Sequence, residues 1–198
     1  MHKSTITQEL ILYRNSRRID FKTNVDWQET HVLFKTGFDT QIRARYATYD
    51  VAFGKYQRPT FQNTSWQKAQ FETVGHKWAD ISDASRGVSL LNDCKYGYDI
   101  KGSRIRLSLL RAPMYPDKEA DKGIHEFTYS LFLHKDPSLE GTVKEAYDLN
   151  VDQLVCEKKE DNSLAILPDA RSFISYSTKG VLLDTIKLAE DNDGFILR

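Results

Sequence analysis

The sequence has few cysteines, no excess of charge of either sign and no long apolar run, and each absence excludes a class of protein. Only Cys94 and Cys156 are cysteines, which is typical of a reducing compartment, although one disulfide is left open. Lys plus Arg and Asp plus Glu both number 28, so there is no basic field for nucleic acid or an anionic membrane. No apolar run approaches the roughly 18 residues of a membrane span. We expect a cytoplasmic protein without nucleic-acid or membrane partners.

Signals for a helical domain, for a phosphate loop and for metal binding are also missing. No segment of about 12 residues carries the sustained apolar stripe that an α/β barrel would repeat. Gly97 and Gly102 stand in turns and belong to no phosphate-binding loop. No two histidines have the spacing of a zinc signature. They are His2, His31, His76, His125 and His134. We therefore expect no metal and no cofactor on this chain.

What the sequence does contain is alternation with a period of two. Residues 19–27 alternate apolar and polar side chains, which predicts a half-buried strand, and residues 32–38 are its expected partner across a short connection. Only residues 141–150 suggest a helix. Further strands are predicted over 47–53, 60–61, 71–78, 88–91, 96–100, 104–111, 125–134, 154–156, 173–177, 180–187 and 194–197. The pattern predicts an all-β fold: a single sandwich of antiparallel sheets over residues 1–198, with at most one or two short helices.

The loop after the strand at 104–111 carries the polar side chains best suited to catalysis or ligand binding. Asp117, Glu119 and Asp121 follow one another there, and His125 opens the next strand. A pair of carboxylates could catalyse glycoside hydrolysis, and three carboxylates could bind Ca²⁺. The simplest interpretation is a solvated loop, because lysines alternate with the acidic residues. Functional residues of β-proteins concentrate in such loops.

Exposed aromatic faces are a second candidate for binding, since sugars stack on them. The candidates are Trp27, Trp66, Trp78, Tyr96, Tyr98 and Tyr115. We expect the tryptophans to lie mostly in the core of a sandwich. Tyr115 is the best ligand contact, because it lies in a loop where no strand packing requires it.

Long segments of the chain resemble the C-terminal region of family 38 glycoside hydrolases, the α-mannosidases, and are most similar to the cytosolic and vacuolar type. The segments are NTSWQKAQFE, HKWADISD, GVSLLNDCKYGYDIKGSRIRLSLLRAPMYPD and ADKGIHEFTYSLFLH, with RIDFKTNVDWQETHVLFK near the start and DTIKLAEDNDGFILR at the end. The chain also ends inside an alternating run at residues 195–198. We therefore expect it to be a fragment of a larger enzyme.

The resemblance implies a mutarotase-like β-supersandwich that braces a catalytic barrel and a helical bundle outside this chain. The parent would hydrolyse terminal α-linked mannose from oligosaccharides with retention, using zinc or another divalent metal. Its catalytic residues and metal would lie on the barrel, so none is expected here. In this family a β-domain arginine lies beside the sugar at a strand end, and Arg111 in LLRAP is the matching position. An ion pair of Arg111 with Asp117 is the alternative role.

The expected substrate contacts are thus Arg111, Tyr115, Asp117, Asp121 and His125. Other functions stay open: a stand-alone carbohydrate-binding module, a domain of a mannosylglycerate-type hydrolase, or a mutarotase-like epimerase. The epimerase would require His125 with Asp121 or Glu126 as its acid/base pair. Self-association into a homo-oligomer is left open too.

Overall fold

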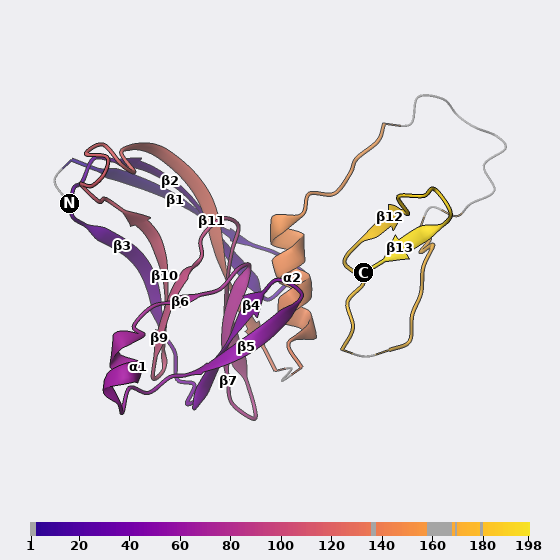
Figure 1. The fold of residues 1–198 in the computed structure, drawn as a ribbon, viewed down its shortest axis with the longest axis horizontal. Helices are drawn as coiled ribbons and strands as arrows, with labels where there is room; N and C mark the ends of the chain where they lie inside the picture. Colours follow the sequence, from indigo (N-terminus) through magenta and orange to yellow (C-terminus); the bar gives the residue numbers. More distant parts are fainter. Residues whose placement is uncertain (1–2, 136–137, 158–167, 169, 179) are drawn as a thin grey trace. The chain divides into compact units, whose positions relative to one another are not determined.

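The computed structural model describes residues 3–135, 138–157, 168, 170–178 and 180–198. Contacts divide the chain into two units, residues 1–153 and residues 154–198 (Figure 1). The first unit contains two antiparallel β-sheets and two helices, and the second contains one small β-hairpin. No helix in the described part is long and apolar enough to cross a membrane.

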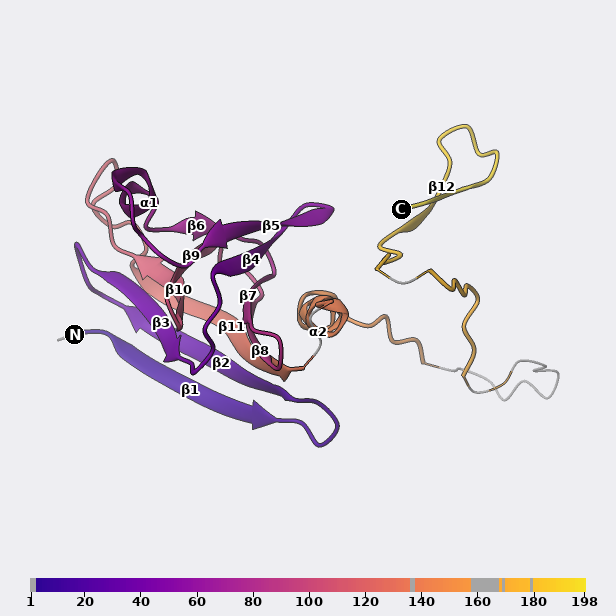
Figure 2. The same cartoon turned by 90° about the horizontal axis from the view of Figure 1, so that it is seen from below.

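The first unit is a β-sandwich, as the alternation predicts. Its seven-stranded sheet has the order β1-β2-β11-β8-β7-β4-β5, and its four-stranded sheet has the order β3-β10-β9-β6. Figure 2 shows the sheets as two layers. The larger sheet consists of β1 (Thr5–Leu12), β2 (Arg18–Trp27), β11 (Gly123–His134), β8 (Gly87–Asn92), β7 (Trp78–Ser82), β4 (Tyr46–Val51) and β5 (Gly54–Pro59). The smaller consists of β3 (Leu33–Asp39), β10 (Arg104–Arg111), β9 (Gly97–Lys101) and β6 (Thr73–Val74).

The main hydrophobic core lies between the two sheets and explains the period-two pattern. Successive side chains of a strand point to opposite faces, so every second residue enters the core. On β10 the buried residues are Ile105, Leu107 and Leu109, with Leu110 joining them at a register shift. Tyr98 on β9 and Trp27 on β2 are fully buried in the same cluster. Alternation therefore predicted these strands, and on β10 its apolar positions enter the core.

The predicted pairing of residues 19–27 with residues 32–38 is wrong. β2 pairs with β1 and β11, whereas β3 pairs with β10 in the other sheet. The connection after Trp27 carries the chain across the sandwich, and Trp27 stacks on Phe34 between the sheets with ring centroids 5.5 Å apart. Burying two large aromatic faces against each other favours this crossing over a local hairpin.

Two strand boundaries near residue 55 also differ from the expectation. The strand predicted over residues 47–53 is β4, which ends at Val51, and a strand that was not predicted, β5, begins at Gly54, ends at Pro59 and lies at an edge of the larger sheet. Phe53 takes a positive φ of 61° in the turn that connects β4 to β5. A proline is tolerated at the end of an edge strand because no neighbour needs its missing N–H. Residues 60–61 are not a strand.

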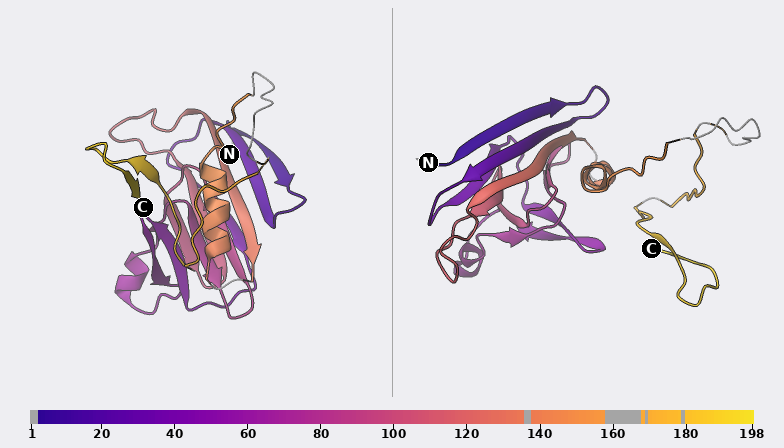
Figure 3. Two further views of the ribbon diagram at one scale, coloured as in Figure 1. Left: turned by 90° about the vertical axis from the view of Figure 1, so that its right-hand side faces the viewer. Right: turned by 90° about the horizontal axis from the view of Figure 1, so that it is seen from above.

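Two short helices complete the first unit. The first, α1 (Ser65–Ala69), lies where no helix was predicted, and Thr64 caps it by accepting a hydrogen bond from the Gln67 N–H. The helix expected over residues 141–150 is α2 (Glu140–Asn150). It runs alongside β7, β8 and β11 on the outer face of the larger sheet (Figure 3, left). A second apolar cluster, which includes Trp78, Leu91 and Ala146, joins α2 to that face.

The second unit has less sheet than expected. Among the residues of this unit that the structure describes, only β12 (Ile186–Leu188) and β13 (Phe195–Leu197) are strands, and they pair with each other. The strands predicted over residues 154–156 and 173–177 are absent, and the one over 180–187 begins only at Ile186. Leu154 and Phe173 are almost fully exposed, and a strand without a neighbour has no ladder to hold it. The assignment of residues 1–198 to one domain stays a prediction.

Tyr98 allows a test of the core through its behaviour in alkali. Its hydroxyl donates to the Leu90 carbonyl over 3.2 Å and accepts from the Asn92 amide, and burial raises the pKa of Tyr98 above its ordinary value of 10.0. The unfolded chain therefore releases this proton at lower pH than the folded chain. The resulting stabilisation is complete below about pH 10 and is lost as the pH rises above it.

We expect Tyr98→Phe to lower the free energy of unfolding by about 1 kcal/mol at pH 8. Above pH 10, the free energy of unfolding of this variant should fall less steeply with pH than that of the parent chain. Urea unfolding between pH 8 and pH 11 measures both effects. Tyr115→Phe, at an exposed tyrosine, is the control and should leave the pH profile unchanged. Identical alkaline profiles for Tyr98→Phe and the parent chain would contradict the assignment.

Candidate functional site

One end of the sandwich gathers most of the candidate residues, and we call it the site end. Arg111 is the last residue of β10, and β11 begins at Gly123, so residues 112–122 form a loop between neighbouring layers (Figure 1). Arg111 lies opposite Leu33 at the start of β3, and Gly123 lies opposite Trp27 at the end of β2. Four strand ends from both sheets therefore surround the loop.

Backbone and side-chain hydrogen bonds anchor this loop at both ends. At its start, the Ala112 carbonyl accepts from His31 N over 2.8 Å and Ala112 N donates to the Val32 carbonyl over 3.1 Å. At its end, Asp121 Oδ2 accepts from Arg111 N over 3.1 Å, and Asp121 takes a positive φ of 62°. The Asp121 carbonyl lies 2.8 Å from His125 Nε2. The backbone N–H of Arg111 and the His125 imidazole thus both contact Asp121.

The other carboxylates of the loop hold its local turns. Asp117 Oδ1 accepts from Glu119 N over 2.9 Å, and Glu119 forms an ion pair with Lys122 at 2.7 Å. No ion pair between Arg111 and Asp117 occurs in the part of the chain that the structure describes, so the guanidinium stays exposed. The end of β10 therefore presents a cation to solvent, while the Asp117 and Asp121 carboxylates accept hydrogen bonds from backbone N–H groups.

Tyr115 projects from the middle of the loop with 88% of its surface exposed. An exposed aromatic ring can stack on the apolar face of a sugar, and its hydroxyl can hydrogen-bond to the sugar hydroxyls. The other aromatic candidates divide: Trp27, Trp78 and Tyr98 are buried in the cores, whereas Trp66 and Tyr96 are exposed outside residues 112–122.

Acid/base chemistry has weaker support at the site end. The pairing of His125 with a carboxylate, which an epimerase would need, is not formed. His125 contacts the backbone carbonyl of Asp121, and the Glu126 carboxylate accepts from the Asn24 amide over 2.8 Å. Within the described ranges, no three His, Cys, Asp or Glu side chains are close enough to hold a metal ion. Cys94 and Cys156 are free thiols. Among the described residues of the site end, His125 therefore has a backbone carbonyl and not a carboxylate as its hydrogen-bond partner.

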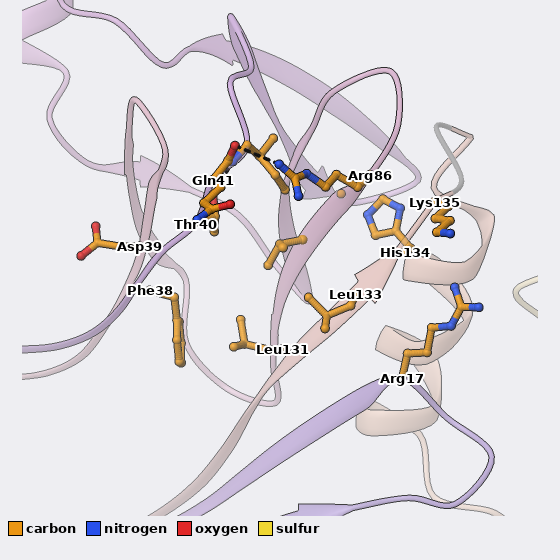
Figure 4. Close-up of a pocket in the computed structure, with 13 residues that line it drawn as sticks. Arg17, Phe38, Asp39, Thr40, Gln41, Arg86, Leu131, Leu133, His134 and Lys135 are labelled. Atoms are coloured by element: carbon orange, nitrogen blue, oxygen red, sulfur yellow. Dashed lines mark hydrogen bonds between the residues drawn. The ribbon is translucent and has the colours of Figure 1, made fainter.

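Sequence reasoning missed a pocket at the opposite end of β11. It has a volume of about 600 Å³, and Figure 4 shows Phe38, Leu131 and Leu133 along its floor. Arg17, Arg86 and Lys135 lie at its rim. The Arg86 guanidinium donates to the Gln41 carbonyl over 3.4 Å, drawn dashed in Figure 4. No local motif marks these residues, because they come from four separate segments.

Sequence reasoning also missed a buried polar network under α2. Asp80 Oδ2 accepts from Ser89 Oγ over 2.8 Å and lies 2.7 Å from His134 Nε2, and the Asp80 side chain is 2% exposed. Asp80 Oδ1 accepts from Ser82, and Ser89 Oγ lies 2.7 Å from the Thr142 hydroxyl of α2. This network, which we call the Asp80 network, connects three strands to the helix. The only sequence signal is a set of polar residues at alternating strand positions.

Comparison with known proteins gives consistent results. The model of the glycosyl hydrolases family 38 C-terminal domain matches residues 1–119. Alpha-mannosidase G of Dictyostelium discoideum is 47% identical over 195 residues, and human alpha-mannosidase 2C1 is 42% identical over 190 residues. These matches cover 98% and 96% of this chain but only 18% of each relative.

Solved structures show the same fold. An alpha-mannosidase from Enterococcus faecalis V583 superimposes with a TM-score of 0.66 at 21% sequence identity, over 72% of this chain and 17% of that one. The predicted all-β sandwich is confirmed by these matches and by the structure itself. The chain spans about a fifth of the length of the curated relatives that it matches.

Proposed function

This chain belongs to the glycosyl hydrolases family 38 C-terminal domain family, and we propose that it is the C-terminal part of an α-mannosidase that removes terminal α-linked mannose from oligosaccharides. The names of the relatives support the activity: those at 41% to 47% identity are all called alpha-mannosidases. Each is more than five times as long as the matched region. The proposal places the enzyme in the cytoplasm, in keeping with two exposed free thiols.

In this proposal, bond cleavage belongs to the part of the enzyme outside this chain. A retaining glycosidase needs two carboxyl groups about 5 to 5.5 Å apart, one as nucleophile and one as acid. The loop carboxylates have other roles here: Asp121 holds Arg111 N and Asp117 holds Glu119 N. Zinc or another divalent metal would act on that other part too, because the described residues contain no ligand cluster for it.

The role of this chain is to brace that catalytic part and to line one side of the sugar cleft. The observation that carries the proposal is the hydrogen bond from Arg111 N to the Asp121 carboxylate. It fixes the backbone from which the exposed Arg111 guanidinium extends, so a sugar hydroxyl could be bound without ordering a loop first. Tyr115 would supply a stacking face in the same loop. Neither group needs to transfer a proton.

The test is Arg111→Ala in the full-length enzyme that carries this domain, assayed on p-nitrophenyl α-mannoside. Losing one charged hydrogen bond to substrate should lower kcat/KM about tenfold or more, with an unchanged thermal midpoint. Arg104→Ala is the matched control, because Arg104 lies on the same strand at its other end and pairs with Asp39. Equal kinetics for the two variants would place Arg111 outside the cleft.

A carbohydrate-binding module is a second candidate, favoured by the exposure of Tyr115. The isolated chain distinguishes the two proposals. We expect it to show no hydrolysis of the aryl mannoside, and to bind mannose far more weakly than the full enzyme because most of the cleft is absent. Hydrolysis by the chain alone would contradict the proposed function. Tight binding that Tyr115→Ala abolishes would favour the binding module.

A further inference from the structure

The strand that carries Arg111 loses one of its two neighbours before it ends. Among the described strands, β10 pairs with β3 from Arg104 to Arg111, but with β9 only from Arg104 to Leu107. Successive backbone N–H groups of a strand point to opposite edges. Ala112 N donates to the Val32 carbonyl on the β3 side. Arg111 N therefore points to the edge along which β9 no longer runs.

Asp121 supplies the acceptor for this N–H group. Its Oδ2 accepts from Arg111 N over 3.1 Å, so a side chain takes the place of a neighbouring strand. Asp121 is itself fixed, because its backbone has a φ of 62° and its carbonyl lies 2.8 Å from His125 Nε2 on β11. Aspartate adopts this left-handed conformation more readily than most other residues. The contact therefore joins the end of β10 to the start of β11.

The β3 side of the same strand end is anchored independently of Asp121. Ala112 is 1% exposed and belongs to the main hydrophobic core. Its carbonyl accepts from His31 N over 2.8 Å. Loss of the Asp121 carboxylate would thus release one side of Arg111 while the core contacts of the strand end remain. A substitution at Asp121 can therefore change the position of Arg111 without unfolding the sandwich.

We propose that Asp121 is a positioning residue for substrate: it fixes Arg111 through the backbone and does not contact the sugar itself. This inference rests on the proposed function, in which the Arg111 guanidinium binds a sugar hydroxyl. A fixed backbone reduces the conformational entropy that Arg111 loses on binding. The hydrogen bond between Asp121 and Arg111 N therefore contributes to substrate affinity, and its effect depends on the presence of the Arg111 side chain.

Three substitutions at Asp121 in the full-length enzyme separate the acceptor oxygen from the backbone conformation. Asp121→Asn keeps an acceptor and tolerates a positive φ, Asp121→Gly keeps only the conformation, and Asp121→Ala keeps neither. On p-nitrophenyl α-mannoside, kcat/KM should stay within about twofold for the Asn variant and fall about threefold to tenfold for the Gly and Ala variants. Glu119→Ala is the matched control and should leave kcat/KM unchanged, because this carboxylate of the same loop pairs with Lys122.

The division of the effect between KM and kcat distinguishes positioning from a loss of folded enzyme. Weaker substrate binding raises KM at constant kcat, whereas a smaller folded fraction lowers kcat at constant KM. We expect the first pattern for Asp121→Ala and Asp121→Gly. A normal kcat/KM for Asp121→Gly would overturn the proposal, and so would equal losses for Asp121→Asn and Asp121→Ala.

A double-mutant cycle with Arg111→Ala tests whether Asp121 acts through Arg111. Once the guanidinium is absent, Asp121→Ala should change kcat/KM by less than about twofold. Additive losses would show that Asp121 affects substrate by another route and would overturn the proposal. A normal kcat/KM for Asp121→Ala, with a loss for Arg111→Ala, would overturn this inference and leave the proposed function in place. Normal kinetics for Arg111→Ala would contradict the cleft contact of the proposed function and the positioning role with it.

Hydrogen exchange of the Arg111 amide provides a readout that does not depend on activity. In the same full-length variants, overlapping peptides analysed by mass spectrometry should show faster exchange for Asp121→Ala and Asp121→Gly than for the parent enzyme and Asp121→Asn. Unchanged exchange in Asp121→Ala would show that the carboxylate does not hold the strand end. That result would overturn the inference whatever the rate of mannoside hydrolysis.

Discussion

Replacing Asp80 by alanine is expected to lower the free energy of unfolding by about 3 to 5 kcal/mol. The Asp80 carboxylate accepts from Ser82 and Ser89 and lies against His134, inside the sheet and beneath α2. Its removal takes away the acceptor of the Ser82 and Ser89 hydroxyls and a close contact of the buried His134 imidazole. Because Ser89 also contacts Thr142 of α2, we expect the helix to loosen in the same variant.

Urea unfolding, followed by the fluorescence of the buried Trp78, measures this effect. Asp80→Asn keeps the shape and one acceptor oxygen, so its loss should be smaller than that of alanine. Asp117→Ala, at an exposed loop carboxylate, is the control and should change stability by less than about 0.5 kcal/mol. A loss below about 1 kcal/mol for Asp80→Ala would show that the network contributes little.

Replacing Trp27 by alanine should have an effect of similar size, about 3 to 5 kcal/mol. The Trp27 side chain is fully buried and stacks on Phe34 of the other sheet. Alanine would leave a large cavity between the two layers, which close packing around it cannot fill. Trp27 lies opposite Gly123, where the loop of the site end rejoins the sheet. We therefore also expect faster amide exchange at Arg111 and Asp121.

Trp66→Ala is the matched control, because Trp66 is 78% exposed and its loss should cost well under 1 kcal/mol. Trp27→Phe should cost less than alanine, because it fills most of the space and removes an indole N–H that has no hydrogen-bond partner within the described structure. Equal stabilities of Trp27→Ala and Trp66→Ala would contradict the role of Trp27 in the core.

The candidate site was only partly predictable, and the reason is the distance along the chain between interacting groups. Asp121 and Arg111 are ten residues apart, so a strand end and its following loop could be recognised together. The Asp80 network joins Asp80 to His134 across 54 residues. Each of its polar residues alone has the appearance of an ordinary solvated position. Only the pairing of β7, β8 and β11 beneath α2 makes them buried partners.

The pairing of strands was likewise outside the reach of local patterns. Alternation is a property of one strand, because it follows from the direction of successive side chains. It predicted the strands β2, β10 and β11, and on β10 the alternating residues Ile105, Leu107 and Leu109 are buried. Pairing depends on how large side chains pack across the interior. Phe34 of β3 stacks on Trp27, and β3 belongs to the other sheet. The short connection at residues 28–30 contained no sign of this crossing.

The sequence by itself determined the fold class, the family and the loop that carries the candidate contacts. The reason is that period-two alternation and the segments that resemble the family are both patterns of consecutive residues. The tertiary structure alone decided which strands are neighbours, which acids support the backbone and which polar residues are buried. Hydrogen-bond partners such as the Asp121 carboxylate for Arg111 N, and the order of the strands in each sheet, exist only after distant segments have packed together, since burial and pairing are properties of the assembled layers.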